Sequence, residues 1–268
     1  MPFATTRDGV NLWFDEHGQG EPIVFVHEFG GEPASWARQV AHFSDRYRCI
    51  TYAARGFHPS DTPDDAALYG QHQATADLGA LLDHLGIDRA HLAGTSMGSF
   101  TSLDFTLEHP ERVQSLTLVG NSSGPRDAEE QARYRSAWVG EEIRLREQSG
   151  CQGAVSVLED DPAYQSLQKN LPLDWQDYAD RLAKQSVEGA LNILKTLHWH
   201  RRSLWTDEAR LRAIACPVLL VHGEEDYFLV GETNLYLERI LINARRECFD
   251  ATGHLVNIEQ AARFNTLF

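Results

Sequence analysis

Short apolar runs recur along the chain at intervals typical of strands that are separated by helices. Most runs are apolar, β-branched or aromatic, and the continuous apolar run at 22–27 is typical of a strand whose two faces are buried in a parallel sheet. The run at 113–119 alternates, and that at 245–249 is mixed. The predicted strands occupy residues 22–27, 47–52, 89–93, 113–119, 216–222 and 245–249. The first 20 residues differ, because an Asp8-Gly9 turn separates 3–7 from 10–16, and this pattern predicts a hairpin.

Amphipathic segments lie between these runs. Ser35 is the predicted N-cap of a helix over 36–43, and residues 71–85 carry leucines at helical spacing. Further helices are expected over 100–107 and from about Asn257 to the end. Strands and helices that alternate in this way predict an α/β protein with a doubly wound, mostly parallel sheet and right-handed crossovers.

The pattern changes between residues 121 and 212, where helix formers, charges and aromatics dominate and no convincing strand appears. We expect an inserted helical cap over 121–212, with the α/β core formed by 1–120 and 213–268. Aromatic residues at helical spacing more often belong to a core than contact a ligand, because each ring must bury a large area. The aromatic residues of this segment include Trp138, Tyr164, Trp175, Tyr178, Trp199 and Trp205.

Length and charge narrow the classes of partner. A chain of 268 residues can bury a sizeable core as one large domain or two smaller ones. Its 24 Lys and Arg residues stand against 39 Asp and Glu residues, which gives a formal charge of −15 with no basic block to relieve it. Nucleic acid and anionic membranes are therefore not expected as partners. A small-molecule substrate is expected instead, and a homo-oligomer is compatible with these features.

The cysteines and the N-terminal residues set further expectations. Cys49, Cys151, Cys216 and Cys248 are scattered singly, without the His and Cys spacing of a zinc site, so no metal or other cofactor is expected. The N-terminal residues lack a basic segment followed by an apolar one, and no apolar stretch reaches the roughly 18 residues that span a membrane. A cytoplasmic location is the resulting expectation.

The stretch Gly94-Thr95-Ser96-Met97-Gly98 joins a predicted strand to a predicted helix. A chain that reverses from strand to helix within five residues forces its central residue into strained geometry, and flanking glycines let the two elements approach. The hydroxyl of Ser96 is then exposed at the carboxyl edge of the sheet. The motif alone also fits an ordinary glycine-rich turn, so its meaning depends on what lies nearby.

An acid and a base follow later strands. Asp226 comes directly after the run 216–222, and His254 follows the run 245–249. The carboxyl ends of parallel strands meet at one edge of a sheet, so these side chains are expected to lie near Ser96. A serine hydroxyl becomes a good nucleophile when an imidazole takes its proton and a carboxylate orients that imidazole.

Taken together, these motifs resemble those of α/β-hydrolase-fold proteins of the esterase, lactonase and haloperoxidase-like group. The matching segments are Val26-His27 with 29–31, 54–56 with Ser60-Asp61, 94–98, 222–226, and Gly253-His254 with Asn257 and Glu259. The resemblance implies that Ser96 is the nucleophile, Asp226 the orienting acid and His254 the base. It also implies an oxyanion hole made by the backbone amides of Phe29 and Met97.

The sequence departs from the family pattern at Glu28, which replaces the glycine that usually follows the histidine of the oxyanion loop. A carboxylate there lies near the floor of the site. Because buried carboxylates need partners, a salt bridge with Arg55 is the first expectation, and contact with substrate is the alternative. Glu28, Phe29 and Met97 are the predicted substrate-binding residues.

Other assignments compete with this one. Asp127 could replace Asp226 as the acid, although the loop that contains Asp226 fits better. His198 and His200 resemble a metal pair, but no third ligand is identifiable, so a role in cap structure or in substrate contact is expected. Histidines at strand ends, His27 and His222, are expected to satisfy backbone groups rather than to act in catalysis.

The predicted reaction is hydrolysis of a small carboxylic ester or lactone through an acyl-enzyme on Ser96. One alternative is hydrolysis of a carbon–carbon bond in a vinylogous diketone, which would require a cation to anchor a carboxylate. Four arginines are candidates for that cation but are expected on solvated faces: Arg126, Arg133, Arg201 and Arg202. A second alternative is a receptor that binds a ligand with little turnover.

Overall fold

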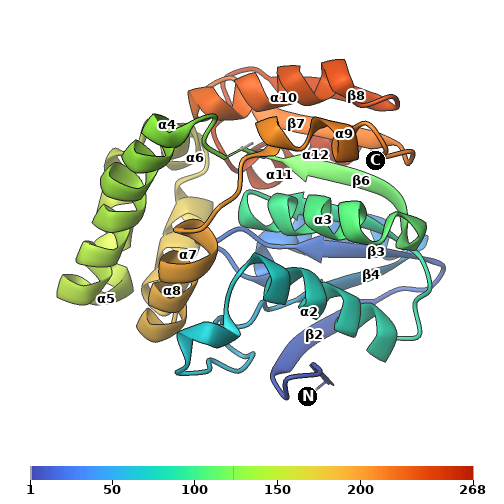
Figure 1. The fold of residues 1–268 in the computed structure, drawn as a ribbon, viewed down its shortest axis with the longest axis horizontal. Helices are drawn as coiled ribbons and strands as arrows, with labels where there is room; N and C mark the ends of the chain where they lie inside the picture. The colour runs from blue at the N-terminus through green and yellow to red at the C-terminus, as the bar shows by residue number, and fades with distance from the viewer. Residues whose placement is uncertain (1, 123, 268) are drawn as a thin grey trace.

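The computed structural model describes residues 2–122 and 124–267. An eight-stranded sheet forms its centre, in the order β1-β2-β4-β3-β5-β6-β7-β8 (Figure 1). The strands are β1 Phe3–Thr5, β2 Asn11–His17, β3 Glu21–Val26, β4 Tyr47–Tyr52, β5 Ala90–Thr95, β6 Val113–Val119, β7 Val218–Gly223 and β8 Ala244–Phe249. Strands β3 to β8 pair in parallel, and the two pairs that β2 forms, with β1 and with β4, are antiparallel. The predicted hairpin and mostly parallel sheet are confirmed.

Helices cover both faces of the sheet. Apolar residues of α2, α3 and α10 pack on one face with those of β3, β5 and β6, and residues of α1, α11 and α12 pack on the other. These helices are α1 Ala37–Phe43, α2 Gln71–His84, α3 Met97–Glu108, α10 Phe228–Ile240, α11 Val256–Glu259 and α12 Ala261–Phe264. The doubly wound arrangement therefore brings the carboxyl ends of β3, β5, β7 and β8 to one edge, where ligand sites of such sheets lie.

The described part of segment 121–212 is helical and contains no strand. Its helices stand beside that edge of the sheet, except the last one, which packs with the core of the sheet (Figure 1). They are α4 Ala128–Arg133, α5 Gly140–Asp160, α6 Pro162–Asn170, α7 Pro172–Ala183, α8 Val187–Ile193 and α9 Glu208–Leu211, with π-helical turns over Tyr134–Val139 and Leu194–His198. A core of Tyr164, Trp175 and Tyr178 packs against Leu255 and Ile258 near the predicted base. The predicted domain boundaries stay a prediction.

Three local predictions differ from the structure. Ser35 does not cap α1, because it lies within a 3-10 turn over Pro33–Trp36 that precedes this helix. The hydroxyl of Ser35 contacts Glu28 instead. The expected terminal helix is broken at Gln260, whose backbone leaves the helical region and whose amide donates to the carbonyl of Asp250. Helix α10 lies between the predicted strands 216–222 and 245–249 and was not predicted.

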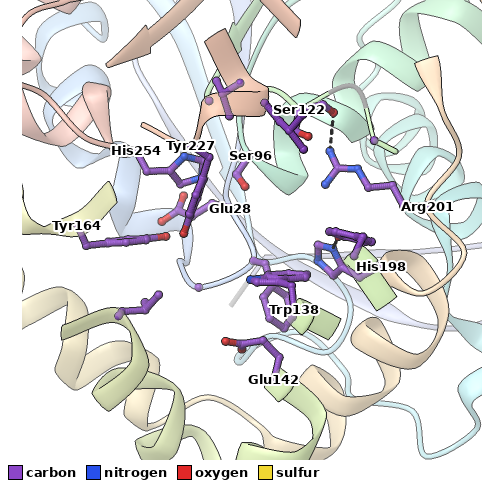
Figure 2. Close-up of a pocket in the computed structure, with 18 of the residues that line it drawn as sticks. Glu28, Ser96, Ser122, Trp138, Glu142, Tyr164, His198, Arg201, Tyr227 and His254 are labelled. Carbon is purple, nitrogen blue, oxygen red and sulfur yellow. Dashed lines mark hydrogen bonds between the residues drawn. The ribbon is translucent and has the colours of Figure 1, made fainter. Parts of the chain in front are cut away.

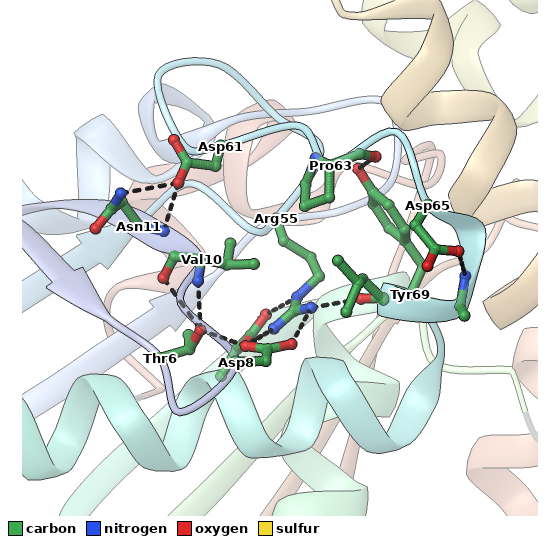
Figure 3. Close-up of polar contacts among 12 residues, drawn as sticks. Thr6, Asp8, Val10, Asn11, Arg55, Asp61, Pro63, Asp65 and Tyr69 are labelled. Carbon is green, nitrogen blue, oxygen red and sulfur yellow. Dashed lines mark hydrogen bonds and ion pairs between the residues drawn. The ribbon is translucent and has the colours of Figure 1, made fainter.

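A buried ionic cluster joins the N-terminal hairpin to the sheet and to α2. The Arg55 guanidinium pairs with Asp77 at 2.5 Å and with Asp8 at 2.8 Å (Figure 3). The Arg55 and Asp77 side chains are 6% and 3% exposed, so each charge depends on the other for compensation.

Replacing Arg55 with leucine is expected to lower the free energy of unfolding by about 3–5 kcal/mol, because Asp77 would be left as a buried, unpaired acid. Denaturant titration measures this change. The matched control is Arg48→Leu, since Arg48 pairs with Glu16 where both side chains are partly exposed. That change should cost about 1 kcal/mol or less. Equal losses in the two variants would contradict the role given to the cluster.

Candidate active site

The turn between β5 and α3 has the geometry of a nucleophile elbow. Ser96 adopts φ 52° and ψ −112°, a left-handed backbone conformation that a non-glycine residue rarely occupies. A Cβ on Gly94 would overlap the backbone of Gly98, and a Cβ on Gly98 would overlap the carbonyl of Val26. The glycines on either side therefore permit the tight reversal, and Ser96 lines the wall of a cavity.

The predicted acid and base meet at this edge of the sheet. Nδ1 of His254 lies 2.8 Å from Oδ1 of Asp226, and both side chains are almost fully buried. The same carboxylate oxygen accepts a hydrogen bond from the backbone N–H of Tyr227 at 2.7 Å. A carboxylate that accepts from Nδ1–H leaves Nε2 of His254 as the basic nitrogen, which is the tautomer a general base needs.

Two effects act on the pKa of His254. Burial disfavours the charged imidazolium, but the negative charge of Asp226 and its hydrogen bond favour it, and the pKa is raised above its ordinary value. Asp226 therefore stabilises the protonated form that a general base reaches during catalysis.

Hydrogen bonds with α6 hold the loop that carries His254 in place. The backbone N–H of His254 donates to the carbonyl of Ala163 at 2.8 Å. Tyr227 donates from its hydroxyl to Asp161, at the N-cap of α6, at 2.8 Å. Glu259 accepts from Ser166 of α6 and from the backbone amides that flank His254. The cap segment thus fixes the position of the imidazole as well as covering it.

Ser96 and His254 share one cavity of about 330 Å³ with Glu28, Phe29 and Tyr164 (Figure 2). The cavity lies between the carboxyl edge of the sheet and helices α5 to α7, and most of its wall is apolar. Side chains that contribute to this wall include Tyr134, Trp138, Leu158, Leu182, Phe228 and Val230. Such a pocket suits a small, largely apolar substrate.

The two amides predicted to form the oxyanion hole lie beside the nucleophile. Phe29 lines the cavity, and no acceptor within the described chain is assigned to the backbone N–H of Phe29 or of Met97. Neither donor is taken up by an acceptor among the described residues. Met97 lies outside the cavity wall and packs with Phe57 and Leu194, so its contact with substrate stays a prediction.

The expected salt bridge between Glu28 and Arg55 is wrong. Arg55 pairs with Asp77 and Asp8, and none of the three lines the cavity. Glu28 is 1% exposed, lines the cavity, and accepts a hydrogen bond from the hydroxyl of Ser35 at 2.8 Å. Burial raises the pKa of the Glu28 carboxyl above its ordinary value.

The other histidines have structural partners. His27 donates from Nδ1 to the carbonyl of Glu28 and accepts at Nε2 from the amide of Ala54, as predicted, and burial lowers its pKa to about 4. His222 contacts the side-chain amide of Asn234 rather than a backbone group. His198 lines the cavity, contacts the hydroxyl of Tyr134 at 3.0 Å, and has a pKa held well below its ordinary value by burial.

Asp127, the alternative acid, and three of the four arginines interact with neighbouring groups of the protein. Asp127 caps α4 by accepting from the amides of Glu129 and Glu130. The other three arginines pair with acidic side chains: Arg126 with Glu130, Arg133 with Glu129, and Arg202 with Asp104 and Asp207.

Arg201 is the exception, and its expected place on a solvated face is wrong. It is 9% exposed, lines the cavity, and donates to the carbonyl of Ser122 at 2.9 Å (Figure 2). Its guanidinium lies over the ring of Phe100, 4.4 Å from the ring centre.

Sequence reasoning missed several residues of the cavity wall. Arg146 and Glu142 of α5 form a buried ion pair there, and Tyr134 and Trp138 stack beside them. Periodicity indicates which face of a helix is buried, but it does not show whether that face meets protein or a cavity. Tyr164 was noted only as an aromatic residue of the cap, and it too lines the cavity.

No helix within 2–122 or 124–267 is both long and apolar enough to cross a membrane. In the same part of the chain, no three His, Cys, Asp or Glu side chains are grouped so that they could hold a metal ion.

Comparison with known proteins gives consistent findings. Residues 21–261 match the family described as alpha/beta hydrolase fold. The chain is 28% identical over 270 residues to a 2-hydroxy-6-oxo-6-phenylhexa-2,4-dienoate hydrolase of Comamonas testosteroni, covering 96% of this chain and 89% of that protein. It is 27% identical over 271 residues to 3-oxoadipate enol-lactonase 2 of Acinetobacter baylyi, covering 97% and 92%. The crystal structure of an enol-lactonase from Burkholderia xenovorans superposes with a TM-score of 0.86 at 22% identity, covering 99% and 97%.

Proposed function

Because the chain belongs to the alpha/beta hydrolase fold family and is a hydrolase, we propose that it cleaves a carboxylic ester or lactone of modest size through Ser96, Asp226 and His254. The observation that carries this proposal is the strained Ser96 in one cavity with a base whose Nδ1 is held by a buried carboxylate. Similarity to an enol-lactonase along nearly the whole chain supports the same chemistry.

The proposed reaction has two stages. Oγ of Ser96 attacks the substrate carbonyl as Nε2 of His254 takes its proton, and the amides of Phe29 and Met97 stabilise the oxyanion. His254 then protonates the departing alkoxide, which leaves an acyl group on Ser96. Water attacks this ester with His254 again as base, and the acid product is released.

Cleavage of a carbon–carbon bond in a vinylogous diketone is the second candidate. Similarity to a dienoate hydrolase supports it, and so does the buried guanidinium of Arg201 on the cavity wall. Within the described chain Nε of Arg201 has no hydrogen-bond partner, so its N–H can donate to a carboxylate of the substrate.

Parallel assays separate the two candidates. We expect steady turnover of p-nitrophenyl acetate and of a simple aliphatic lactone, with slower turnover of a 2-hydroxy-6-oxo-dienoate. A dienoate hydrolysed much faster than every ester and lactone would favour the second candidate. Saturable binding of such compounds without turnover of any of them would favour a receptor and contradict both.

The acid limb of activity is expected to follow His254. The imidazole must be neutral to accept a proton, and Asp226 raises its pKa, so kcat/KM should fall as the pH drops through a value above the ordinary 6.5. Initial rates with p-nitrophenyl acetate between pH 5 and pH 9 measure this inflection. An inflection below the ordinary value would contradict the raised pKa and would show that burial outweighs the charge of Asp226.

A further inference from the structure

Glu28 places a second acid in the cavity that the proposed triad does not use. It follows β3 and His27 in the loop that supplies the amide of Phe29. Its carboxyl group lies in the same part of the cavity as Ser96, His254 and Tyr164 (Figure 2). A side chain in this position can touch the acyl part of a bound substrate.

The loop is built around this carboxyl group. A Cβ on Gly31 would overlap Oε1 of Glu28, so only glycine lets the carboxyl fold back against the loop. The hydroxyl of Ser35 then donates to Oε1 at 2.8 Å. Gln185, which follows α7, donates to the carbonyls of Gly30 and Gly31 at 3.0 Å each and so holds the loop in place.

These contacts leave the other oxygen of Glu28 unused. Oε2 is buried and has no hydrogen-bond partner among the described residues. A buried polar atom without a partner is costly, so such an atom in a cavity wall is a candidate contact for a ligand.

No cation in the described chain forms an ion pair with Glu28. The charged and titratable groups that face it are His254, Arg181 and Tyr178, together with Tyr164. His254 is bound by Asp226, and Arg181 is shared between Glu32 and Asp177. Burial therefore prevails, and the pKa of Glu28 is raised, which favours the neutral carboxylic acid.

We propose that Glu28 works as a neutral carboxylic acid whose Oε2–H donates a hydrogen bond to a second oxygen in the acyl part of the substrate. This inference rests on the proposed function at Ser96. A neutral donor is also compatible with the oxyanion that forms beside this loop, whereas an ionised carboxylate there would oppose it. The substrate class that fits is an ester or lactone whose acyl chain carries a ketone oxygen, because a ketone accepts a hydrogen bond and cannot donate one.

A pair of matched substrates tests this role. The p-nitrophenyl esters of 4-oxopentanoic acid and pentanoic acid differ by one ketone oxygen. We expect the wild-type enzyme to favour the oxoacyl ester by about tenfold in kcat/KM near neutral pH, the discrimination that one buried hydrogen bond supplies. Glu28→Leu should reduce this ratio to about 1, and Glu28→Gln should keep it, because the amide also donates.

The pH dependence of the same ratio adds a second readout. As the pH rises through the raised pKa of Glu28, the acid loses its proton and the preference should fall in the wild type but not in Glu28→Gln. The titration of His254 acts on both esters equally, so it cancels in the ratio. Glu111→Gln, a change of a largely exposed acid, is the control and should leave the ratio as in the wild type.

The outcomes separate this inference from the proposed function. If the wild-type enzyme hydrolyses neither ester, the proposed function fails. If it hydrolyses both esters but Glu28→Leu keeps the wild-type ratio, the Glu28 inference alone is overturned. It is also overturned if Glu28→Gln slows both esters equally and moves the acid limb to lower pH, since Glu28 would then act as a carboxylate that supports the imidazolium of His254.

Discussion

Replacing Ser96 with alanine should lower kcat/KM for p-nitrophenyl acetate by about 10⁴-fold or more. The change removes one oxygen atom and with it the nucleophile, so no acyl-enzyme can form. The Cβ of alanine occupies the position of the serine Cβ, so the strained turn at φ 52° is kept. Initial rates on the purified variant measure the effect, with circular dichroism to show that it is folded.

Ser102→Ala is the matched control for this experiment. Ser102 lies on the same helix, α3, and its buried hydroxyl donates to the carbonyl of Gly98 without touching the cavity. The control should keep kcat/KM within a few-fold of the wild type. A Ser96→Ala variant that keeps a tenth or more of the wild-type activity would show that another group forms the covalent bond or that none forms.

Asp226→Asn is expected to lower kcat by about 10³- to 10⁴-fold. The new amide can present its NH₂ group to Nδ1 of His254, which then becomes the acceptor and places the proton on Nε2. A ring in that tautomer cannot accept a proton from Ser96. Loss of the negative charge should also move the acid limb of the pH profile to lower pH, because Asp226 raises the pKa of His254.

Asp127→Asn is the control for the acid. Asp127 caps α4 with its side chain, and asparagine is also a good N-cap, so stability and activity should change little. If Asp127→Asn abolished activity and Asp226→Asn did not, the assignment of the acid would be reversed.

The sequence was sufficient to predict the sheet and the residues at its carboxyl edge. A parallel strand is buried on both faces, so β3 and β7 stand out as contiguous apolar runs. Because such strands end at one edge, Ser96, Asp226 and His254 could be expected together despite their separation along the chain. The fold prediction and the prediction of a hydrolase are confirmed.

The contacts that buried charged side chains make could not be predicted in this way. Glu28 was the predicted partner of Arg55, but the packing of α2 and of the hairpin brings Asp77 and Asp8 to Arg55, and Glu28 accepts from Ser35 instead. The position of Arg201 depends on how the helical segment 121–212 sits on the sheet edge. Hydrophobic periodicity does not contain that information.

Mass spectrometry after treatment with a fluorophosphonate tests the central claim most directly. A fluorophosphonate phosphonylates a serine only when a base activates it and an oxyanion hole receives the developing charge. We predict a single adduct per chain, located at Ser96 by peptide mapping, that forms much more slowly in the Asp226→Asn variant. An unlabelled wild-type enzyme, or an adduct on any residue other than Ser96, would contradict the account.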